Sequence, residues 1–176
     1  LVRLSDELAV HGVDAVRRAC REEIKAGADY IKVMANGGVA SPVDPIAFLG
    51  FSESELRAAV EEAAMAQTYV AAHLYTDEAI ARAARCGVLS LEHCNLITEE
   101  TARAAAAAGC MACHTLVTYE ALKAEGASLG LGAESVAKID DVRLAGLHSQ
   151  EAMTKLLELM NRCKTNAEIF ELLARA

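Results

Sequence analysis

Short apolar segments alternate with longer segments of helical periodicity along the chain, and this alternation restricts the fold more than any other feature. Four segments are predicted as strands: 30–34, 69–73, 88–91 and 110–116. Helices are predicted at about 13–26, 52–67, 76–87, 98–109, 119–125, 135–163 (with a break) and 166–176. Strands that alternate with amphipathic helices form parallel βα units, so the predicted fold class is α/β.

Two arrangements of such units remain open, an open doubly wound sheet and part of a (β/α)8 barrel. A closed eight-stranded barrel typically needs ~250 residues, whereas this chain has 176. No internal repeat, low-complexity tract or linker divides the chain. We therefore expect residues 1–176 to form a single domain.

Composition and charge exclude several classes of protein. The net charge of −8 gives an acidic surface, which repels phosphate, so a nucleic-acid partner is not expected. The chain has no basic cluster for an anionic membrane and no apolar run as long as a membrane span. The first residues lack a signal-peptide pattern, and the six cysteines are interpreted as reduced thiols, so we expect a cytoplasmic protein.

Three side chains that can bind metal occupy matching places in successive units. Lys32 lies within the first predicted strand, His73 closes the second, and His93 follows the third. Chemistry in α/β folds collects at the carboxyl ends of parallel strands, where these side chains would converge. Two imidazoles suit zinc or a similar ion. A buried lysine is costly as an ammonium; one solution is reaction with carbon dioxide, which gives an anionic carbamate able to bridge two metal ions.

Each of these residues also has a purely structural interpretation. Lys32 could be an ion-paired lysine with Glu92 as its partner, and a histidine at the end of a strand often packs without binding metal. The string Cys110-Met-Ala-Cys113-His114 spells a c-type haem attachment motif, but it falls in a predicted buried strand. We interpret its cysteines as small buried side chains. His114, at the active-site end of that strand, could contact substrate.

The order of these motifs resembles the amidohydrolase superfamily, with the prolidase-like and imidazolonepropionase-like peptidases as the nearest branch. The resemblance extends over about residues 13–153. It is carried by the segments 27–34 (GADYIKVM), 35–42 (ANGGVASP), 72–76 (AHLYT) and 91–97 (LEHCNLI). A lysine within a strand, then His-x-Tyr, then Glu-His-x-Asn-Leu-Ile is a more specific signal than any one motif.

This resemblance implies a fold, a metal centre and a reaction. The fold would be a partial (β/α)8 barrel of about four consecutive βα units followed by C-terminal helices. Lys32 would be the carboxylated lysine that bridges two divalent ions, with zinc expected, and His73 and His93 would be metal ligands. Tyr75 would lie near the substrate. The reaction would be hydrolysis of the amide bond in dipeptides or N-acyl amino acids.

Two parts of the family pattern are not found in the chain. The His-x-His pair of the first barrel strand is absent, and so is the Asp of the eighth strand, which binds metal and shuttles the catalytic proton. Asp140 and Asp141 precede the next predicted helical stretch and do not replace it, so no catalytic residue is identified. The alternative hypothesis is a non-catalytic truncated barrel that associates with a second copy or with the rest of its barrel.

Overall fold

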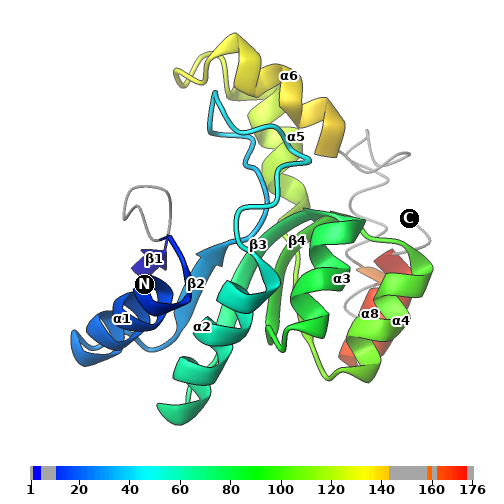
Figure 1. The fold of residues 1–176 in the computed structure, drawn as a ribbon. Coiled ribbons are helices and arrows are strands. Elements are labelled where there is room, and N and C mark those ends of the chain that lie inside the picture. Colours follow the sequence, from blue (N-terminus) through cyan, green and yellow to red (C-terminus); the bar gives the residue numbers. More distant parts are fainter. Residues whose placement is uncertain (1, 5–10, 143–157, 160–161, 174–176) are drawn as a thin grey trace.

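The computed structural model describes residues 2–4, 11–142, 158–159 and 162–173. Its centre is a five-stranded parallel sheet in the order β1-β2-β3-β4-β5, so each strand pairs with the next one along the chain (Figure 1). The strands are β1 (Val2–Leu4), β2 (Ile31–Met34), β3 (Val70–Thr76), β4 (Ser90–Leu96) and β5 (Met111–Cys113). Sequential parallel pairing with intervening helices confirms the α/β class and is the arrangement of consecutive barrel units.

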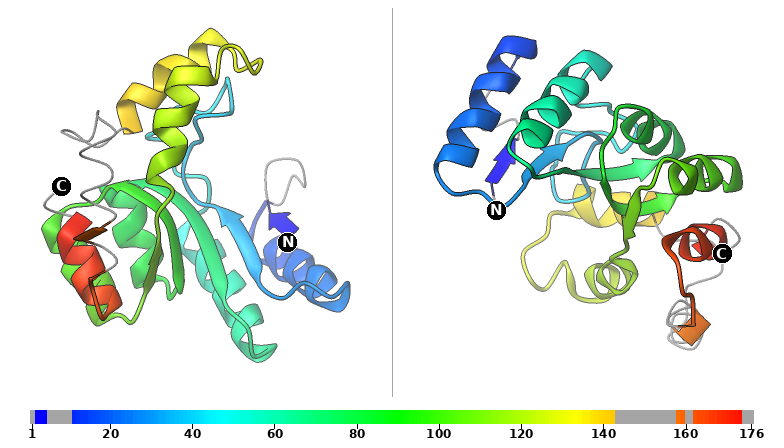
Figure 2. Two further views of the ribbon diagram at one scale, coloured as in Figure 1. Left: turned by 180° about the vertical axis from the view of Figure 1, so that it is seen from behind. Right: turned by 90° about the horizontal axis from the view of Figure 1, so that it is seen from below.

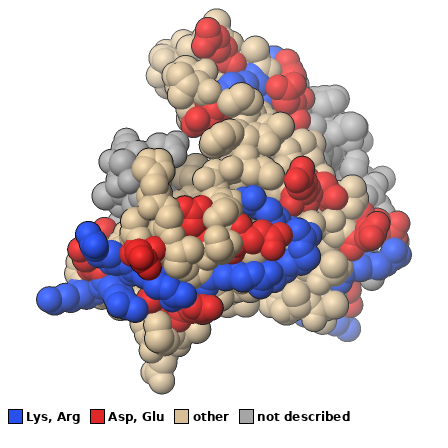
Figure 3. Space-filling model, in the orientation of Figure 1, with Lys and Arg blue, Asp and Glu red and all other residues tan. Residues whose placement is uncertain are grey.

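Four helices form a layer on one face of the sheet, as the view from below shows (Figure 2). They are α1 (Val13–Lys25), α2 (Glu53–Met65), α3 (Asp77–Arg85) and α4 (Glu99–Ala107). The helix α8 (Asn166–Leu173) packs against α4 and β5. Acidic and basic side chains are interspersed over the outer surface of this layer (Figure 3). No helix in the described part of the chain is long and apolar enough to span a bilayer.

The starts of three helices follow directly from their capping residues. Ser52 accepts the backbone N–H of Glu55, whose carboxylate accepts the N–H of Ser52 in return, so α2 begins with a capping box. Thr76 and Thr98 cap α3 and α4 with their hydroxyls in the same way. The predicted helices 52–67, 76–87 and 98–109 begin at these three residues, and the caps place each helix directly after its strand or loop.

The main core lies between the sheet and the helix layer. Its largest fully buried side chains are aliphatic and come from both layers: Ile31, Leu56, Leu74, Ile80 and Leu91. Alanines fill much of the remaining contact between helices and strands. Small side chains of this kind allow helices to approach the sheet closely, which explains how a chain with 4% aromatic residues forms a dense core.

A second, smaller apolar cluster lies near the carboxyl ends of the strands. Helices α5 (Leu116–Glu125) and α6 (Ala133–Val142) form a hairpin that projects from the sheet together with the loop 35–50 (Figure 1). The cluster joins this loop, β3 and the hairpin through Val39, Ile46, Tyr75, Tyr119, Ile139 and Val142. Lys138 of α6 donates hydrogen bonds to the carbonyl oxygens of Ser41 at 2.6 Å and Asp44 at 2.5 Å. The loop is therefore fastened to the hairpin.

The structure corrects several predicted boundaries. Strand β1 was not predicted, since three residues carry no periodic signal. Strands β3 and β4 continue to Thr76 and Leu96, so His73 and His93 lie within their strands and do not end them. The predicted strand 110–116 ends at Cys113, because its apolar end is already the first turn of α5. Most of the predicted helix 135–163 lies outside the described residues.

Candidate active site

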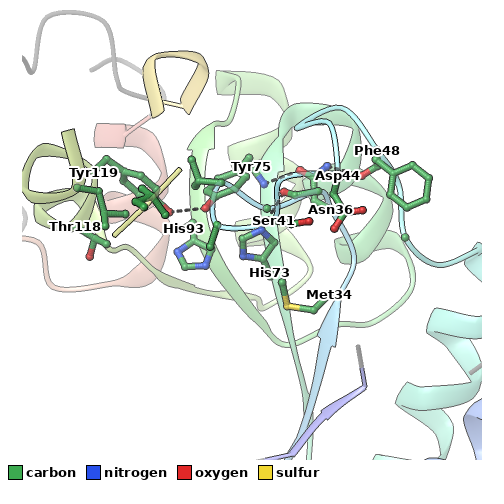
Figure 4. A pocket seen from close by; sticks show the side chains of 17 residues that line it. Met34, Asn36, Ser41, Asp44, Phe48, His73, Tyr75, His93, Thr118 and Tyr119 are labelled. Atoms are coloured by element: carbon green, nitrogen blue, oxygen red, sulfur yellow. Dashed lines mark hydrogen bonds between the residues drawn. The ribbon is translucent and has the colours of Figure 1, made fainter. Parts of the chain in front are cut away.

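A cavity of about 540 Å³ opens at the carboxyl ends of β2, β3 and β4 (Figure 4). Its walls come from β2, the loop 35–50, β3, β4 and the hairpin α5–α6. Three residues predicted from the sequence line it: His73, Tyr75 and His93. Gly37 and Gly38 of the loop 35–50 line it as well. A Cβ at Gly37 would lie 1.9 Å from the carbonyl oxygen of Pro45, so only glycine fits there.

A β-bulge brings His93 beside His73. Strand pairing aligns His73 with Glu92, and simple alternation along β4 would turn the next side chain to the opposite face. Instead, His93 and Cys94 adopt left-handed backbone conformations, with φ of 73° and 53°, and the register between β3 and β4 shifts. The two imidazole rings consequently lie 4.6 Å apart between centroids. Strained backbone of this kind is concentrated at functional sites.

A ring nitrogen of each imidazole contacts a hydrogen-bonding group of the protein. Nε2 of His73 lies 3.1 Å from the carbonyl oxygen of Gly37, and Nδ1 of His93 lies 2.6 Å from the hydroxyl oxygen of Thr115. A hydrogen bond to one nitrogen fixes the ring orientation and makes the other nitrogen the metal ligand. For His93, the donor atom toward a metal ion would be Nε2.

Lys32 lies on the same face of the sheet, one row below the histidines. Its register partner is Ala71, two residues before His73. Its Nζ lies 3.8 Å from Oε2 of Glu92, so the ion pair that the sequence allowed for is present. In the described part of the chain, no three His, Cys, Asp or Glu side chains gather to hold a metal ion. A metal centre here would therefore need Lys32 or ligands from elsewhere.

Burial keeps two side chains of the site, His93 and Tyr75, in their uncharged forms. Desolvation, with smaller contributions from the neighbouring charges of His73 and Lys32, lowers the pKa of His93 to about 3. The imidazole of His93 is thus neutral at physiological pH, which is the form that binds metal. Burial and the neighbouring Tyr119 raise the pKa of Tyr75 well above its usual range, so this phenol keeps its proton.

Two further residues of the site were not predicted. Tyr119 of α5 donates a hydrogen bond to the hydroxyl of Tyr75 at 3.1 Å and lines the cavity with it. Asn36 joins the loop 35–50 to β3, because its Oδ1 accepts the backbone N–H groups of Tyr75 and Thr76 while its amide donates to Ile46 and Phe48 carbonyls. Asn36 belongs to the Asn-Gly-Gly string, and that string was the available signal for it.

His114 contacts the backbone of the bulge and is not among the described residues that line the cavity. Its Nδ1 is 2.7 Å from the carbonyl oxygen of His93, and its Nε2 is buried without a hydrogen-bond partner in the described part of the chain. Substrate contact by His114 stays a prediction. Cys110 is buried, whereas Cys113 is exposed.

Comparison with known proteins settles the family. The model of the amidohydrolase family matches residues 4–165. The chain belongs to the amidohydrolase family. The crystal structure of another amidohydrolase has 59% sequence identity and a TM-score of 0.76, and the match covers 83% of this chain and 35% of that one. A prolidase solved in complex with N-methylphosphonate-L-proline has 53% identity and a TM-score of 0.76 over 83% of this chain and 36% of that one.

A curated relative gives the same family by sequence. Ochratoxinase of Aspergillus niger is 47% identical over 89 residues, which are 51% of this chain and 18% of that protein. This amidohydrolase chain thus spans about a third of the solved structures and less than a fifth of the curated relative. The resemblance seen in the sequence and the partial (β/α)8 barrel are both confirmed.

Proposed function

We propose that this chain forms part of the active site of a metal-dependent hydrolase that cleaves amide bonds in dipeptides or N-acyl amino acids. The observation that carries the proposal is the pair of imidazoles from β3 and β4, 4.6 Å apart at the edge of a cavity of about 540 Å³. The related prolidase with its bound proline phosphonate supports a peptide-like substrate.

The residues present fit a centre of divalent metal ions. His73 and His93 each have one ring nitrogen held by the protein and lie on the same side of the sheet as Lys32. In the proposal, Lys32 leaves its ion pair with Glu92 and loses a proton to water, and the neutral amine then forms an N–C bond to carbon dioxide and releases a second proton to give the anionic carbamate ligand. Bound there, two ions such as Zn²⁺ would polarise the scissile carbonyl and lower the pKa of water.

The chain's own residues position the substrate. Tyr75 and Tyr119 form one polar corner of the cavity, and protonated Tyr75 can donate a hydrogen bond to a substrate carbonyl or carboxylate oxygen. Met34, Phe48 and Leu122 line the walls and suit an apolar side chain. No Lys or Arg of the described residues lines the cavity. The residue that would exchange the catalytic proton is not identified.

A second candidate function rests on the edges of the sheet. Among the described residues, β1 and β5 are the outer strands of the sheet, and each pairs with one neighbouring strand. Open edges of parallel strands invite pairing with further strands. In this alternative, the chain is a truncated barrel without catalysis that associates with a second copy or with the rest of its barrel.

The test uses the full-length protein, purified without chelators. We expect about two zinc ions per chain and hydrolysis of L-alanyl-L-proline or N-acetyl-L-leucine, both lost in Lys32→Ala. The matched control is Lys25→Ala, which removes an exposed lysine at the end of α1. Absence of bound metal and of hydrolysis in the parent protein would reject the hydrolase and favour the truncated barrel.

A further inference from the structure

A continuous line of hydrogen bonds joins the ring of His93 to the hydroxyl of Tyr75. Nδ1 of His93 lies 2.6 Å from Oγ1 of Thr115. The Thr115 hydroxyl donates to the hydroxyl oxygen of Tyr119 at 3.4 Å, and the Tyr119 hydroxyl donates to that of Tyr75 at 3.1 Å. The labelled side chains of Tyr75, His93 and Tyr119 meet at one side of the cavity (Figure 4).

Thr115 has an unusual position for a residue that makes such bonds. It is the N-cap of α5, where a threonine hydroxyl ordinarily accepts a backbone N–H of the first helical turn. Here Thr115 makes no side-chain cap hydrogen bond. Its hydroxyl is turned instead to His93 and Tyr119, which indicates that the side chain serves the site and not the helix.

The direction of the bonds determines the tautomer of His93. A hydroxyl has one proton, and that of Thr115 is given to Tyr119. Oγ1 of Thr115 must then accept the bond from His93, so Nδ1 of His93 carries the proton. A neutral imidazole with its proton on Nδ1 has its lone pair on Nε2.

The same direction determines what Tyr75 can offer to a substrate. Its oxygen accepts the proton of Tyr119, so the proton of Tyr75 itself is not used in that bond. A hydroxyl that accepts one proton still has its own proton to donate, and Tyr75 can give it to another acceptor. Because Tyr75 lines the cavity, a substrate oxygen there is the natural acceptor.

We infer that Thr115 and Tyr119 are positioning residues, which through one directional chain present the Nε2 lone pair of His93 to a metal ion and the hydroxyl proton of Tyr75 to the substrate. The roles at the two ends rest on the proposed function. The chain of hydrogen bonds and the tautomer do not depend on it, so they can be tested without metal or substrate.

The first measurement is the tautomer of His93 by ¹⁵N NMR of the metal-free, full-length protein labelled at histidine. We expect the Nδ1–H form in the parent protein, and a parent with the proton on Nε2 overturns the inference outright. Thr115→Val removes the acceptor, so the Nδ1–H population should fall, whereas Thr115→Ser keeps the hydroxyl and should restore it.

Tyr119→Phe tests whether the bonds act as a chain. Tyr119 makes no hydrogen bond to His93, yet without its oxygen the Thr115 proton can turn toward Nδ1 and favour the other tautomer. We expect a shifted tautomer in Tyr119→Phe and none in Tyr69→Phe, a matched control whose ring stacks on Tyr30 outside the site. An unchanged tautomer in both Thr115→Val and Tyr119→Phe overturns the inference.

Zinc titration separates this inference from the proposed function. Loss of a hydrogen bond that orients a metal ligand typically weakens metal affinity by ~10- to 100-fold, and we expect about 10-fold for Thr115→Val with recovery in Thr115→Ser. A tautomer that responds to the variants in a protein that binds no zinc would uphold the chain and reject the metal centre.

Discussion

Ionisable side chains are buried in two regions of the molecule, and one region keeps its side chain charged whereas the other keeps its side chain neutral. Between α1 and α2, the side chain of Glu62 is 3% exposed and receives both Arg17 at 3.1 Å and Arg21 at 2.7 Å. These hydrogen bonds lower the pKa of Glu62 and keep it ionised. At the carboxyl ends of β3 and β4, His93 is buried beside His73 and Lys32, and its pKa falls to about 3.

The difference separates a structural contact from a candidate active site. A buried carboxylate with its full set of donors is compensated, and its role is to fix how two helices pack. The buried imidazole of His93, beside other basic side chains, is instead kept neutral. A hydroxyl contacts one of its nitrogens, and its backbone lies in a bulge. That arrangement adds little to stability but prepares a ligand or a base.

The largest effect is expected from removing the imidazole of His93. His93→Asn keeps a polar residue that tolerates a φ of 73°, so the bulge should persist. We expect zinc affinity to fall by at least about 100-fold, more than for loss of an orienting hydrogen bond. Titration with zinc measures this. Glu62→Gln is the control from the other region, and equal metal loss in both variants would erase the distinction between them.

The pH dependence of stability provides the next test, in the metal-free protein. The pKa of His93 is about 3 in the folded state, whereas its ordinary value is 6.5. Between pH 3 and pH 6.5, His93 is therefore protonated in the unfolded chain but not in the folded protein. The free energy of unfolding should therefore fall as the pH drops below 6.5, by up to about 1.4 kcal/mol per pH unit. Denaturation by urea at several pH values measures the slope.

His93→Asn should flatten this slope between pH 6.5 and pH 4.5, the range in which Glu62 does not titrate. The lowered pKa of Glu62 means that its contribution is complete above its ordinary value of 4.5 and is lost only as the pH falls further. An identical slope in the parent and in His93→Asn would show that the imidazole is not held neutral by the fold.

A smaller effect is expected from Glu62→Gln. The change removes the charge that accepts Arg17 and Arg21, and hydrogen bonds to charged groups contribute about 2 kcal/mol. The free energy of unfolding should fall by about this amount, with zinc affinity unchanged. Glu61→Gln is the matched control, because Glu61 contacts the same Arg17 from an exposed position and should matter much less. Equal losses would mean that burial is irrelevant here.

The sequence predicted the repeating units of the fold well, since strand segments and helix caps are local signals. Ser52, Thr76 and Thr98 are the N-caps of α2, α3 and α4, at the positions where the helices were predicted to begin. The sequence also predicted that His73 and His93 converge. It did not predict the means, because the bulge at His93 arises from a register shift against β3, which no local pattern of residues encodes.

The sequence was least informative where an element's type was ambiguous. Residues 114–116 were interpreted as the end of a strand, yet Thr115 is the N-cap of α5, which begins at Leu116. The earlier start of α5 brings Thr115 and Tyr119 to His93 and Tyr75, so the hydrogen-bonded chain was hidden by one wrong boundary. The His93–Thr115 and Tyr75–Tyr119 contacts join residues that are 22 and 44 positions apart in the sequence. Their prediction requires the correct start of α5.

The smallest effect on stability should come from Lys138, whose charge is compensated in a third way, by backbone carbonyl oxygens alone. Its ammonium holds Ser41 and Asp44, two residues of the cavity wall, against α6. Lys138→Met keeps much of the aliphatic stem, so the free energy of unfolding should fall by about 1 kcal/mol or less. The loop should nevertheless loosen, with faster hydrogen exchange at 40–44 and a KM raised about threefold at nearly constant kcat.

The control is Lys123→Met. Lys123 forms an ion pair with the exposed Asp140 on the same hairpin, and this variant breaks that pair without affecting a contact to the cavity wall. If the two variants raise KM equally, the loop is held by the apolar cluster around Ile46 and Ile139 rather than by the charge.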